Sequence, residues 1–246
     1  MDALILNEAF EAIFIVDSFE SLIWTDRDQE AGDFEIYCFP APEVLENAKA
    51  DYYLVNPESE HVMIIEGSEI TTDAEDGNRL IITGQSLESI LNRRILFDQI
   101  TLSGNLQNEI ERILKENIIE PEDESRKISN FIFVESDDPR ITELEIDTQY
   151  SQGQNIYDMI AKLCSTNKIG FKVVLTDNFE FAFSLYKGQD RSYEQDINPY
   201  VIFSPNFENM INSDYIESKK DYKNVPLVAG EEVNSIIKTK LVGAVS

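Results

Sequence analysis

The segment SLIWTDRDQEAGDFEI, residues 21–36, places two short runs of β-branched and aromatic residues on either side of a polar stretch. Such runs are typical of strands joined by a turn. The segments LIITGQSLESILNRRI (80–95) and NPYVIFSPNFENMINSDYIES (198–218) have the same build. None of the three combines a nucleophile, a base and an orienting partner, and the whole chain holds 1 His and 2 Cys. The pattern indicates a protein that works by assembly.

The first 95 residues read mainly as strands separated by polar turns. The pattern predicts three strands in the first forty residues, a short helix, three more strands and a helix in which Ser86 occupies the N-cap position. These elements span residues 12–16, 21–25 and 33–39, then 40–49 (helix), 51–84 (three strands, with Asp76-Gly77 as a hairpin signal) and 87–94 (helix).

The middle of the chain mixes helices and strands. Leu106, Ile110, Ile113 and Leu114 recur at helical spacing and predict an amphipathic helix over 105–117. The pattern then predicts a charged loop (120–127) and strands at 128–135 and 142–147. After these come a second amphipathic helix at 156–166, with Ile160 and Leu163 buried, and a hairpin of 171–175 with 179–186. In the hairpin, Phe179, Phe181 and Phe183 alternate, which predicts three rings on one buried face.

Strand signals return at 200–204, 210–218, 225–228 and 238–242. The predicted fold class is therefore α+β and β-rich. Residues 1–99 form a strand-rich, barrel-like domain, and residues 100–196 form an inserted α/β lobe. Residues 197–246 either return to the first domain or begin a second, incomplete one.

The charge is strongly acidic and unevenly distributed. The chain carries 47 acidic and 20 basic residues for a net charge of −27, and residues 1–90 alone carry 21 acidic and 3 basic residues, a net charge of −18. Such a field repels nucleic acid and anionic membranes. Two interpretations stay open: a solvated acidic surface, or a passage whose acidic wall keeps DNA from adhering over a Debye length of about 8 Å. No apolar run approaches the ~20 residues that span a bilayer, so membrane insertion is not expected.

The other chemistry-bearing residues favour structural roles. Cys38 and Cys164 lack metal or redox spacing, and Cys164 follows the apolar face of a helix, which predicts a buried free thiol. His61 is interpreted as a surface residue near a turn. The acidic groups at 73–76 and 137–138 lack the spacing of a calcium loop, so no metal and no cofactor is predicted. A carboxylate pair of the glycosidase type remains an alternative of low specificity, since 47 acids allow any pair to be nominated.

Two small clusters are candidates for an interface. Trp24, Asp26 and Arg27 follow a strand, and Trp and Arg are enriched at interface hot spots. The alternative is that Trp24 packs in the core while Asp26 and Arg27 pair at the turn. Arg93 and Arg94 form the second cluster, at a helix end where they complement the dipole and can meet an acidic neighbour.

Five segments, in this order, carry a resemblance: WTDR with EAGDFEI, ITGQSLESILNRR, TLSGNLQNEIERIL, the IDTQY–NIYD–IGFK run, and NPYVIFSPNFENMINS with LVAGE. Together they resemble the N-terminal hub region of siphophage and prophage tail-associated (Tal-type) proteins, the siphovirus Gp37-like family. The resemblance implies a phage tail-hub fold with barrel-like tube domains and an inserted lobe. It also implies a structural component of the tail tip, in the virion or a phage-like particle, synthesised in the cytoplasm of the bacterial host.

The resemblance further implies partners. These are other copies of the chain in a trimeric ring, the distal tail protein and the tape-measure protein, with genomic DNA passing through without specific binding. The family's wall-degrading activity resides in added C-terminal domains, so this chain is predicted to be non-enzymatic. The alternatives are a carbohydrate-active, cell-wall-degrading enzyme using a carboxylate pair, or a carbohydrate-binding module that contacts the host surface.

Overall fold

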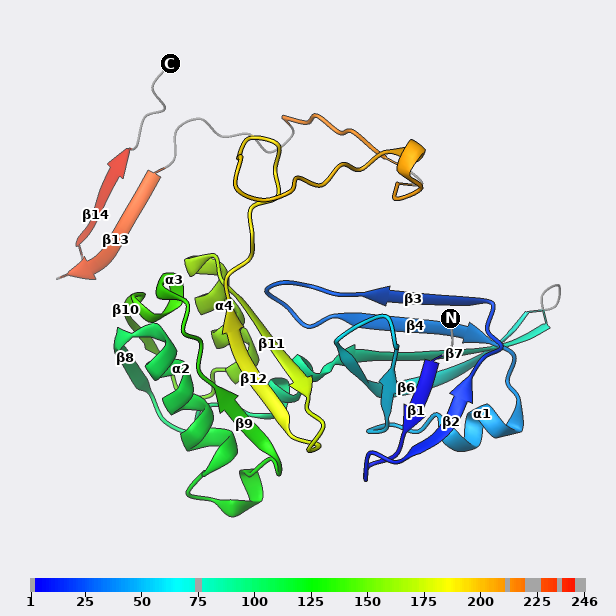
Figure 1. Ribbon diagram of the computed structural model, residues 1–246. Coiled ribbons are helices and arrows are strands. Elements are labelled where there is room, and N and C mark those ends of the chain that lie inside the picture. The colour runs from blue at the N-terminus through cyan, green and yellow to red at the C-terminus, as the bar shows by residue number, and fades with distance from the viewer. Residues whose placement is uncertain (1–2, 74–76, 211–212, 220–226, 234–235, 242–246) are drawn as a thin grey trace. The chain divides into compact units, whose positions relative to one another are not determined.

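The computed structural model describes residues 3–73, 77–210, 213–219, 227–233 and 236–241. The chain forms two compact units, Met1–Gln189 and Asp190–Ser246. The first unit combines a large antiparallel sheet with an α/β lobe, and the second holds extended chain and a two-stranded hairpin (Figure 1).

The sheet of the first unit has seven strands in the order β2-β1-β5-β6-β7-β4-β3, and all neighbouring pairs are antiparallel. Within the described residues no strand pairs with the outer side of β2 or β3, although these two strands follow one another along the chain. The strands predicted for residues 12–84 are confirmed, as is the short helix predicted at 40–49, whereas strand β1 was not predicted. Their bounds are β1 (Ala3–Leu6), β2 (Ala12–Val16), β3 (Ser21–Thr25), β4 (Asp33–Cys38), α1 (Pro42–Asn47), β5 (Tyr53–Val55), β6 (Val62–Asp73) and β7 (Gly77–Ser86).

Alternation along the strands buries one face of this sheet. In β4, Phe34, Ile36 and Cys38 are buried while the residues between them are half-buried, as expected for a sheet with one apolar face. Gly84 of β7 lies so close to β6 that a Cβ there would be 1.9 Å from the Ile64 carbonyl oxygen. The close approach of the two strands therefore requires glycine at this position.

The α/β lobe follows the 3-10 helix η1 (Leu87–Arg93). It contains a two-stranded sheet, β10-β8, and a three-stranded sheet, β11-β12-β9, in which β12 and β9 are parallel. The bounds are β8 (Ile100–Asn105), α2 (Leu106–Leu114), a π-helical turn η2 (Lys115–Ile119), η3 (Glu124–Arg126), β9 (Phe131–Val134), α3 (Pro139–Thr142), β10 (Glu145–Tyr150), α4 (Ile156–Asn167), β11 (Gly170–Leu175) and β12 (Phe181–Tyr186).

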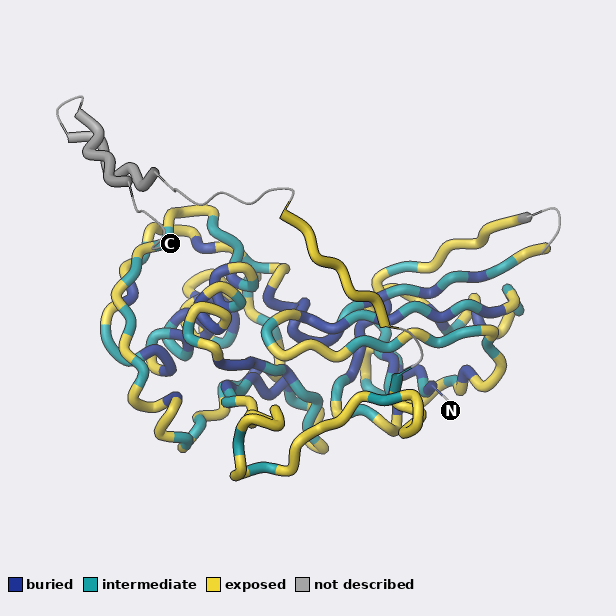
Figure 2. Tube along the Cα trace, turned by 90° about the horizontal axis from the view of Figure 1, so that it is seen from above, coloured by how far each residue is buried: buried dark blue, intermediate teal, exposed yellow. Residues whose placement is uncertain are grey.

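Both predicted amphipathic helices are present and capped. The Asn105 side chain accepts a hydrogen bond from the Asn108 amide at 3.2 Å, and Asn155 accepts one from Asp158 at the same distance. The predicted core residues of both helices are buried: Leu106, Ile110, Ile113, Leu114, Ile160 and Leu163. Figure 2 shows the buried residues of this unit continuing from the lobe into the sheet. The lobe core indeed includes Val62 and Ile64 of β6.

Two local predictions for the first unit are wrong, the bounds of one strand and the placement of Phe179. The strand predicted at 142–147 begins at Glu145, because Asp138 caps the short helix α3 that opens with Pro139. Ser86 occupies the N-cap position of η1, as predicted, but its hydroxyl accepts the Gly32 amide hydrogen at 2.7 Å and makes no capping hydrogen bond.

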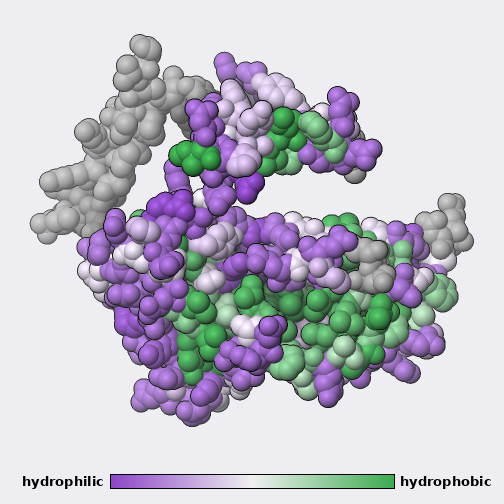
Figure 3. Space-filling model, in the orientation of Figure 1, coloured by the Kyte–Doolittle hydropathy of each residue, from purple (hydrophilic) through white to green (hydrophobic). Residues whose placement is uncertain are grey.

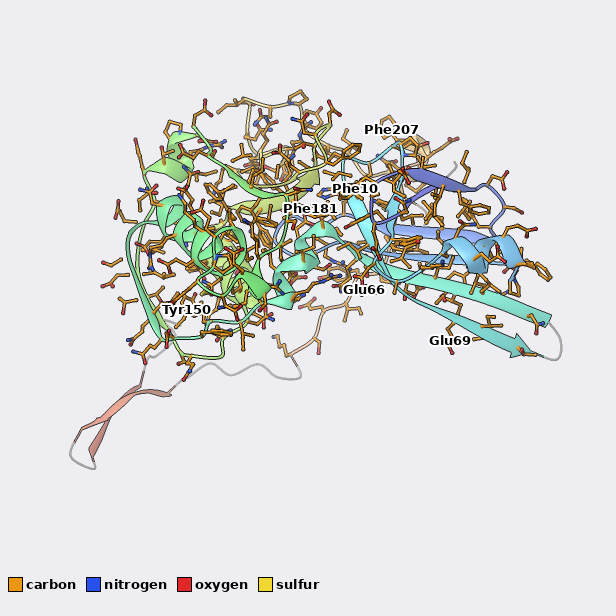
Figure 4. All side chains as sticks on the ribbon, turned by 90° about the horizontal axis from the view of Figure 1, so that it is seen from below. Phe10, Glu66, Glu69, Tyr150, Phe181 and Phe207 are labelled. Atoms are coloured by element: carbon orange, nitrogen blue, oxygen red, sulfur yellow. The ribbon has the colours of Figure 1, made fainter. Side chains whose placement is uncertain are left out.

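Phe179 does not share the buried face of Phe181 and Phe183. It lies in the turn before β12 with φ at 59°, and 48% of it is exposed. Its ring stacks on Phe10, with centroids 5.4 Å apart, and Phe10 also lies beside Phe181 (Figure 4).

The second unit departs most from the predicted pattern. Within the described residues of 200–204 and 210–218 no strand forms. Asn209 explains the first case, because its side chain accepts the Ser204 amide hydrogen and donates to the Ile202 carbonyl, both at 2.8 Å. The 3-10 turn η4 (Pro205–Phe207) follows, and β13 (Leu227–Val233) pairs with β14 (Ile236–Leu241). The strands predicted at 225–228 and 238–242 lie only partly within the described residues.

Candidate interface and the junction between sheet and lobe

Trp24 and Asp26 contact each other directly at the end of β3. The indole Nε1 donates a hydrogen bond to Asp26 Oδ1 at 3.0 Å, and the indole ring stacks on Phe34 with centroids 6.2 Å apart. Asp26 also accepts a hydrogen bond from the Ser59 hydroxyl at 3.3 Å. Trp24 is partly buried against the sheet core, which leaves part of its ring available to a partner.

One interpretation of the sequence paired Arg27 with Asp26, but the structure shows Arg27 paired with Asp33 instead. Its guanidinium lies 3.0 Å from Asp33 Oδ1 and donates to the Ala31 carbonyl at 2.9 Å. The hydrogen bond from Arg27 lowers the pKa of Asp33, so this carboxylate is ionised at neutral pH. The guanidinium thus closes the loop between β3 and β4.

Arg93 and Arg94 lie at the end of η1 and point to different partners. Arg93 Nη2 is 2.5 Å from Asp51 Oδ1, and Arg94 Nε donates to the Arg126 carbonyl at 2.6 Å. Among the contacts of the described residues, none joins this pair to Trp24, Asp26 or Arg27. The structure therefore places the five candidate residues in two separate clusters.

The loop between β3 and β4 also attaches the lobe to the sheet. The Ala31 amide donates a hydrogen bond to the Tyr157 hydroxyl of α4 at 2.7 Å, and the Tyr186 hydroxyl of β12 donates to the Asp28 carbonyl at 3.2 Å. At Gly170 a Cβ would lie 2.6 Å from Asp28 Oδ1, so this loop approaches β11 closely. We call this set of contacts, with those of Glu88 described next, the sheet–lobe junction.

Glu88 and His61 form the most buried polar pair of the junction. The Glu88 side chain is 2% exposed and that of His61 13% exposed, with Nδ1 and Oε1 3.6 Å apart. Glu88 Oε1 also accepts the Val173 amide hydrogen of β11 at 2.7 Å. The interpretation of His61 as a surface residue is therefore wrong, because its side chain is largely buried and lies against Glu88 of η1. The Glu88 carboxylate raises the pKa of His61, although burial opposes the rise.

Acidic side chains gather on the face of the sheet opposite its core. Glu35 of β4 and the exposed Glu66 and Glu69 of β6 lie on this side, the latter two labelled in Figure 4. Glu35 and Glu66 line a shallow depression of about 380 Å³ together with Ile23 and Thr83. We call this face, with Glu35, Glu66 and Glu69, the acidic wall of the sheet.

The described residues contain no group of three or more His, Cys, Asp or Glu side chains placed to hold a metal ion. The acidic stretch at 73–76 lies largely outside the described residues, and Asp138 serves as a helix cap paired with Arg140. Both Cys38 and Cys164 are buried free thiols, as predicted for Cys164. No helix in the described part of the chain has the length and apolar character needed to cross a bilayer.

The fold is that of phage tail proteins. The chain is similar to prophage tail protein gp18 from Listeria monocytogenes EGD-e, with a TM-score of 0.50 and 13% identity over 93% of this chain and 58% of that one. The family model of siphovirus ReqiPepy6 Gp37-like proteins matches residues 2–244, and the chain belongs to this family. Family and fold together support a phage tail structural component, as the sequence resemblance implied.

Two further solved structures are more distantly similar. The E. coli c3393 protein, described as a type VI secretion component resembling the T4 tail proteins gp27 and gp5, has a TM-score of 0.42 and 14% identity over 71% of this chain and 48% of that one. The tail protein from Neisseria meningitidis MC58 has a TM-score of 0.44 and 9% identity over 79% of this chain and 52% of that one. None of the curated protein sequences compared with the chain matches it.

Proposed function

We propose that this protein is a structural component of a phage or prophage tail tip, a hub that continues the tail tube and takes part in DNA passage and host attachment. The observation that carries the proposal is the family match over residues 2–244, supported by the tail-protein fold. The proposed location is the tail tip of a virion or phage-like particle, after synthesis in the host cytoplasm. The proposed partners are further copies of the chain, the distal tail protein and the tape-measure protein.

The proposed architecture keeps residues 1–99 as a tube domain, 100–196 as an inserted lobe and 197–246 as return strands or the start of a second tube domain. A ring of copies needs two complementary faces on each chain. The edge strands β2 and β3 offer two such faces, since an open sheet edge is a template for pairing with another chain. Ile15 on β2 is 54% exposed, and Figure 3 shows apolar residues on the face over β1 and β2.

The candidate residues fit contacts between copies. Trp24 and Asp26 end the edge strand β3, and we propose that Trp24, Asp26 and Arg27 form one side of the contact. We propose that Arg93 and Arg94 meet an acidic face of the neighbouring copy. The wall with Glu35, Glu66 and Glu69 would then face the bore, where its charge keeps DNA moving by repulsion.

A non-enzymatic role is part of this proposal. A glycosidase pair needs one carboxyl group whose pKa is raised so that it can act as the acid. Among the described residues, the carboxyl groups whose pKa departs from the ordinary value instead have it lowered, each by a hydrogen bond that stabilises the carboxylate. They are Asp33, Glu60, Asp123, Asp138 and Asp190. These directions give the carboxylate-pair alternative no support.

Light scattering and electron microscopy across a salt series test the hub assignment. We expect a monomer or weak association in dilute solution at low salt, and ring-shaped trimers as salt screens the acidic walls. Replacing Glu35, Glu66 and Glu69 by Gln should lower the salt concentration at which the chains associate. The matched control replaces the exposed lobe residues Glu120, Glu122 and Glu124 by Gln and should follow the parent chain. A tight dimer that ignores salt would contradict the proposal.

A further inference from the structure

Glu88 carries a carboxylate oxygen that the fold leaves without a hydrogen-bond partner. Its Oε1 accepts the Val173 amide hydrogen at 2.7 Å, whereas Oε2 is buried and has no partner among the described residues. The side chain is 2% exposed. A carboxylate buried in this way is costly unless a positive charge compensates it.

His61 is placed to supply that charge. Its Nδ1 lies 3.6 Å from Glu88 Oε1, too far for a hydrogen bond of ordinary length but well within ion-pair distance. Lys172 of β11 lies in the same region, but Glu60 holds its ammonium group at 2.8 Å. The compensation of Glu88 therefore depends on whether the imidazole of His61 carries a proton.

We propose that His61 and Glu88 form a pH-dependent latch of the sheet–lobe junction. His61 belongs to the segment that enters β6 of the large sheet, Glu88 belongs to η1, and the carboxylate of Glu88 holds β11 of the lobe through Val173. The protonated latch closes the junction, and loss of the proton loosens β11. This inference concerns the fold alone and does not depend on the tail role.

Other charged and titratable groups face His61 from the elements packed around the junction. The neighbouring carboxylates of Glu60 and Asp26 add to the attraction of Glu88 for the imidazolium. Tyr157 of α4 and Tyr186 of β12 face the same region, and burial raises the pKa of both hydroxyls, which keeps them neutral. Asp28 lies beside Tyr186, and Lys172 of β11 lies over the Tyr186 ring at 5.8 Å.

The sign of the pH dependence follows from the raised pKa of His61. A group whose pKa is higher in the folded than in the unfolded state stabilises the fold fully below its unfolded value, about 6.5 for His. This stabilisation is lost as the pH rises through the folded value. The latch is therefore closed in mildly acidic solution and weakens toward alkaline pH.

A proton NMR titration tests the first half of the proposal, because the chain has 1 His and the imidazole signal is unambiguous. We expect His61 to titrate above about 6.5, and the Glu88→Gln variant to titrate at or below that value. Glu58→Gln is the matched control, since Glu58 is exposed and does not contribute to the shift at His61. An ordinary or lowered pKa in the parent chain, or no change in Glu88→Gln, overturns the latch.

Amide hydrogen exchange at Val173 tests the second half. The protection factor should fall as the pH rises from below about 6.5, the ordinary value for His, through the folded-state pKa of His61. The fall should be absent in His61→Gln. Equal pH dependence in both proteins overturns the proposal. Since these readouts use the parent chain and His61→Gln, they decide the matter even if Glu88→Gln fails to fold.

Discussion

Replacing Tyr157 by Phe should measure what the sheet–lobe junction contributes to stability. The hydroxyl accepts the Ala31 amide hydrogen at 2.7 Å, and Ala31 is 7% exposed. The ring of Phe can keep the edge-on contact with Phe171, whose centroid lies 6.1 Å away. The substitution therefore removes one oxygen and leaves a buried amide unsatisfied, which costs about 1–3 kcal/mol.

Urea and thermal unfolding near pH 7 provide the measurement. For a chain of this size each kcal/mol lowers Tm by about 2–4 °C. Fluorescence of Trp24, the single tryptophan, reports on the sheet, while far-UV circular dichroism reports on the helices of the lobe. Tyr37→Phe is the matched control, because its hydroxyl donates to Glu35 on the outer face of the sheet and its loss should cost less than about 0.5 kcal/mol. A Tyr157→Phe variant as stable as this control would refute the role assigned to the hydrogen bond.

Three further substitutions and one chemical treatment have defined outcomes. Leu114→Ala and Leu163→Ala should each lower the free energy of unfolding by about 2–5 kcal/mol in urea titrations, because both side chains are buried in the lobe core. Gly84→Ala should destabilise the sheet by about 1–3 kcal/mol or more, since its Cβ would meet the Ile64 carbonyl at 1.9 Å; an unchanged Tm would contradict this packing. Burial raises the pKa of Cys164 to about 12, so iodoacetamide at about pH 8 should leave it unmodified in the native protein and label it after unfolding.

Local periodicity was enough to predict most elements of the first unit. Leu106 and Leu114 belong to a helical repeat, and Asn105, directly before it, is a residue type that favours the N-cap. The alternation of residues in 33–39 indicates which side of β4 is buried. Two of the errors occur where a side chain offers the backbone a competing hydrogen bond. Asp138 starts a helical turn ahead of β10, and Asn209 occupies backbone groups that a strand at 200–204 would have used.

The junction could not be predicted from the sequence because its partners are far apart along the chain. Ala31 and Tyr157 are separated by 126 positions, and Asp28 and Tyr186 by 158. The polar stretch of 26–32 has the composition of an ordinary turn, and nothing local indicates that α4, β11 and β12 close over it.

His61 illustrates how contacts between distant parts of the chain change the electrostatic environment of a residue. Because it follows Glu60 in the sequence, His61 looks like an exposed residue. In the fold, however, its imidazole lies beside Glu88 of η1, whose carboxylate also accepts the Val173 amide hydrogen of β11. A buried carboxylate that orients a backbone amide must have its charge balanced, and breaking such a pair costs more than the pair itself contributes. The orientation of the lobe on the sheet therefore rests on a few polar contacts as well as on the apolar core. A proton on one imidazole is enough to alter one of them.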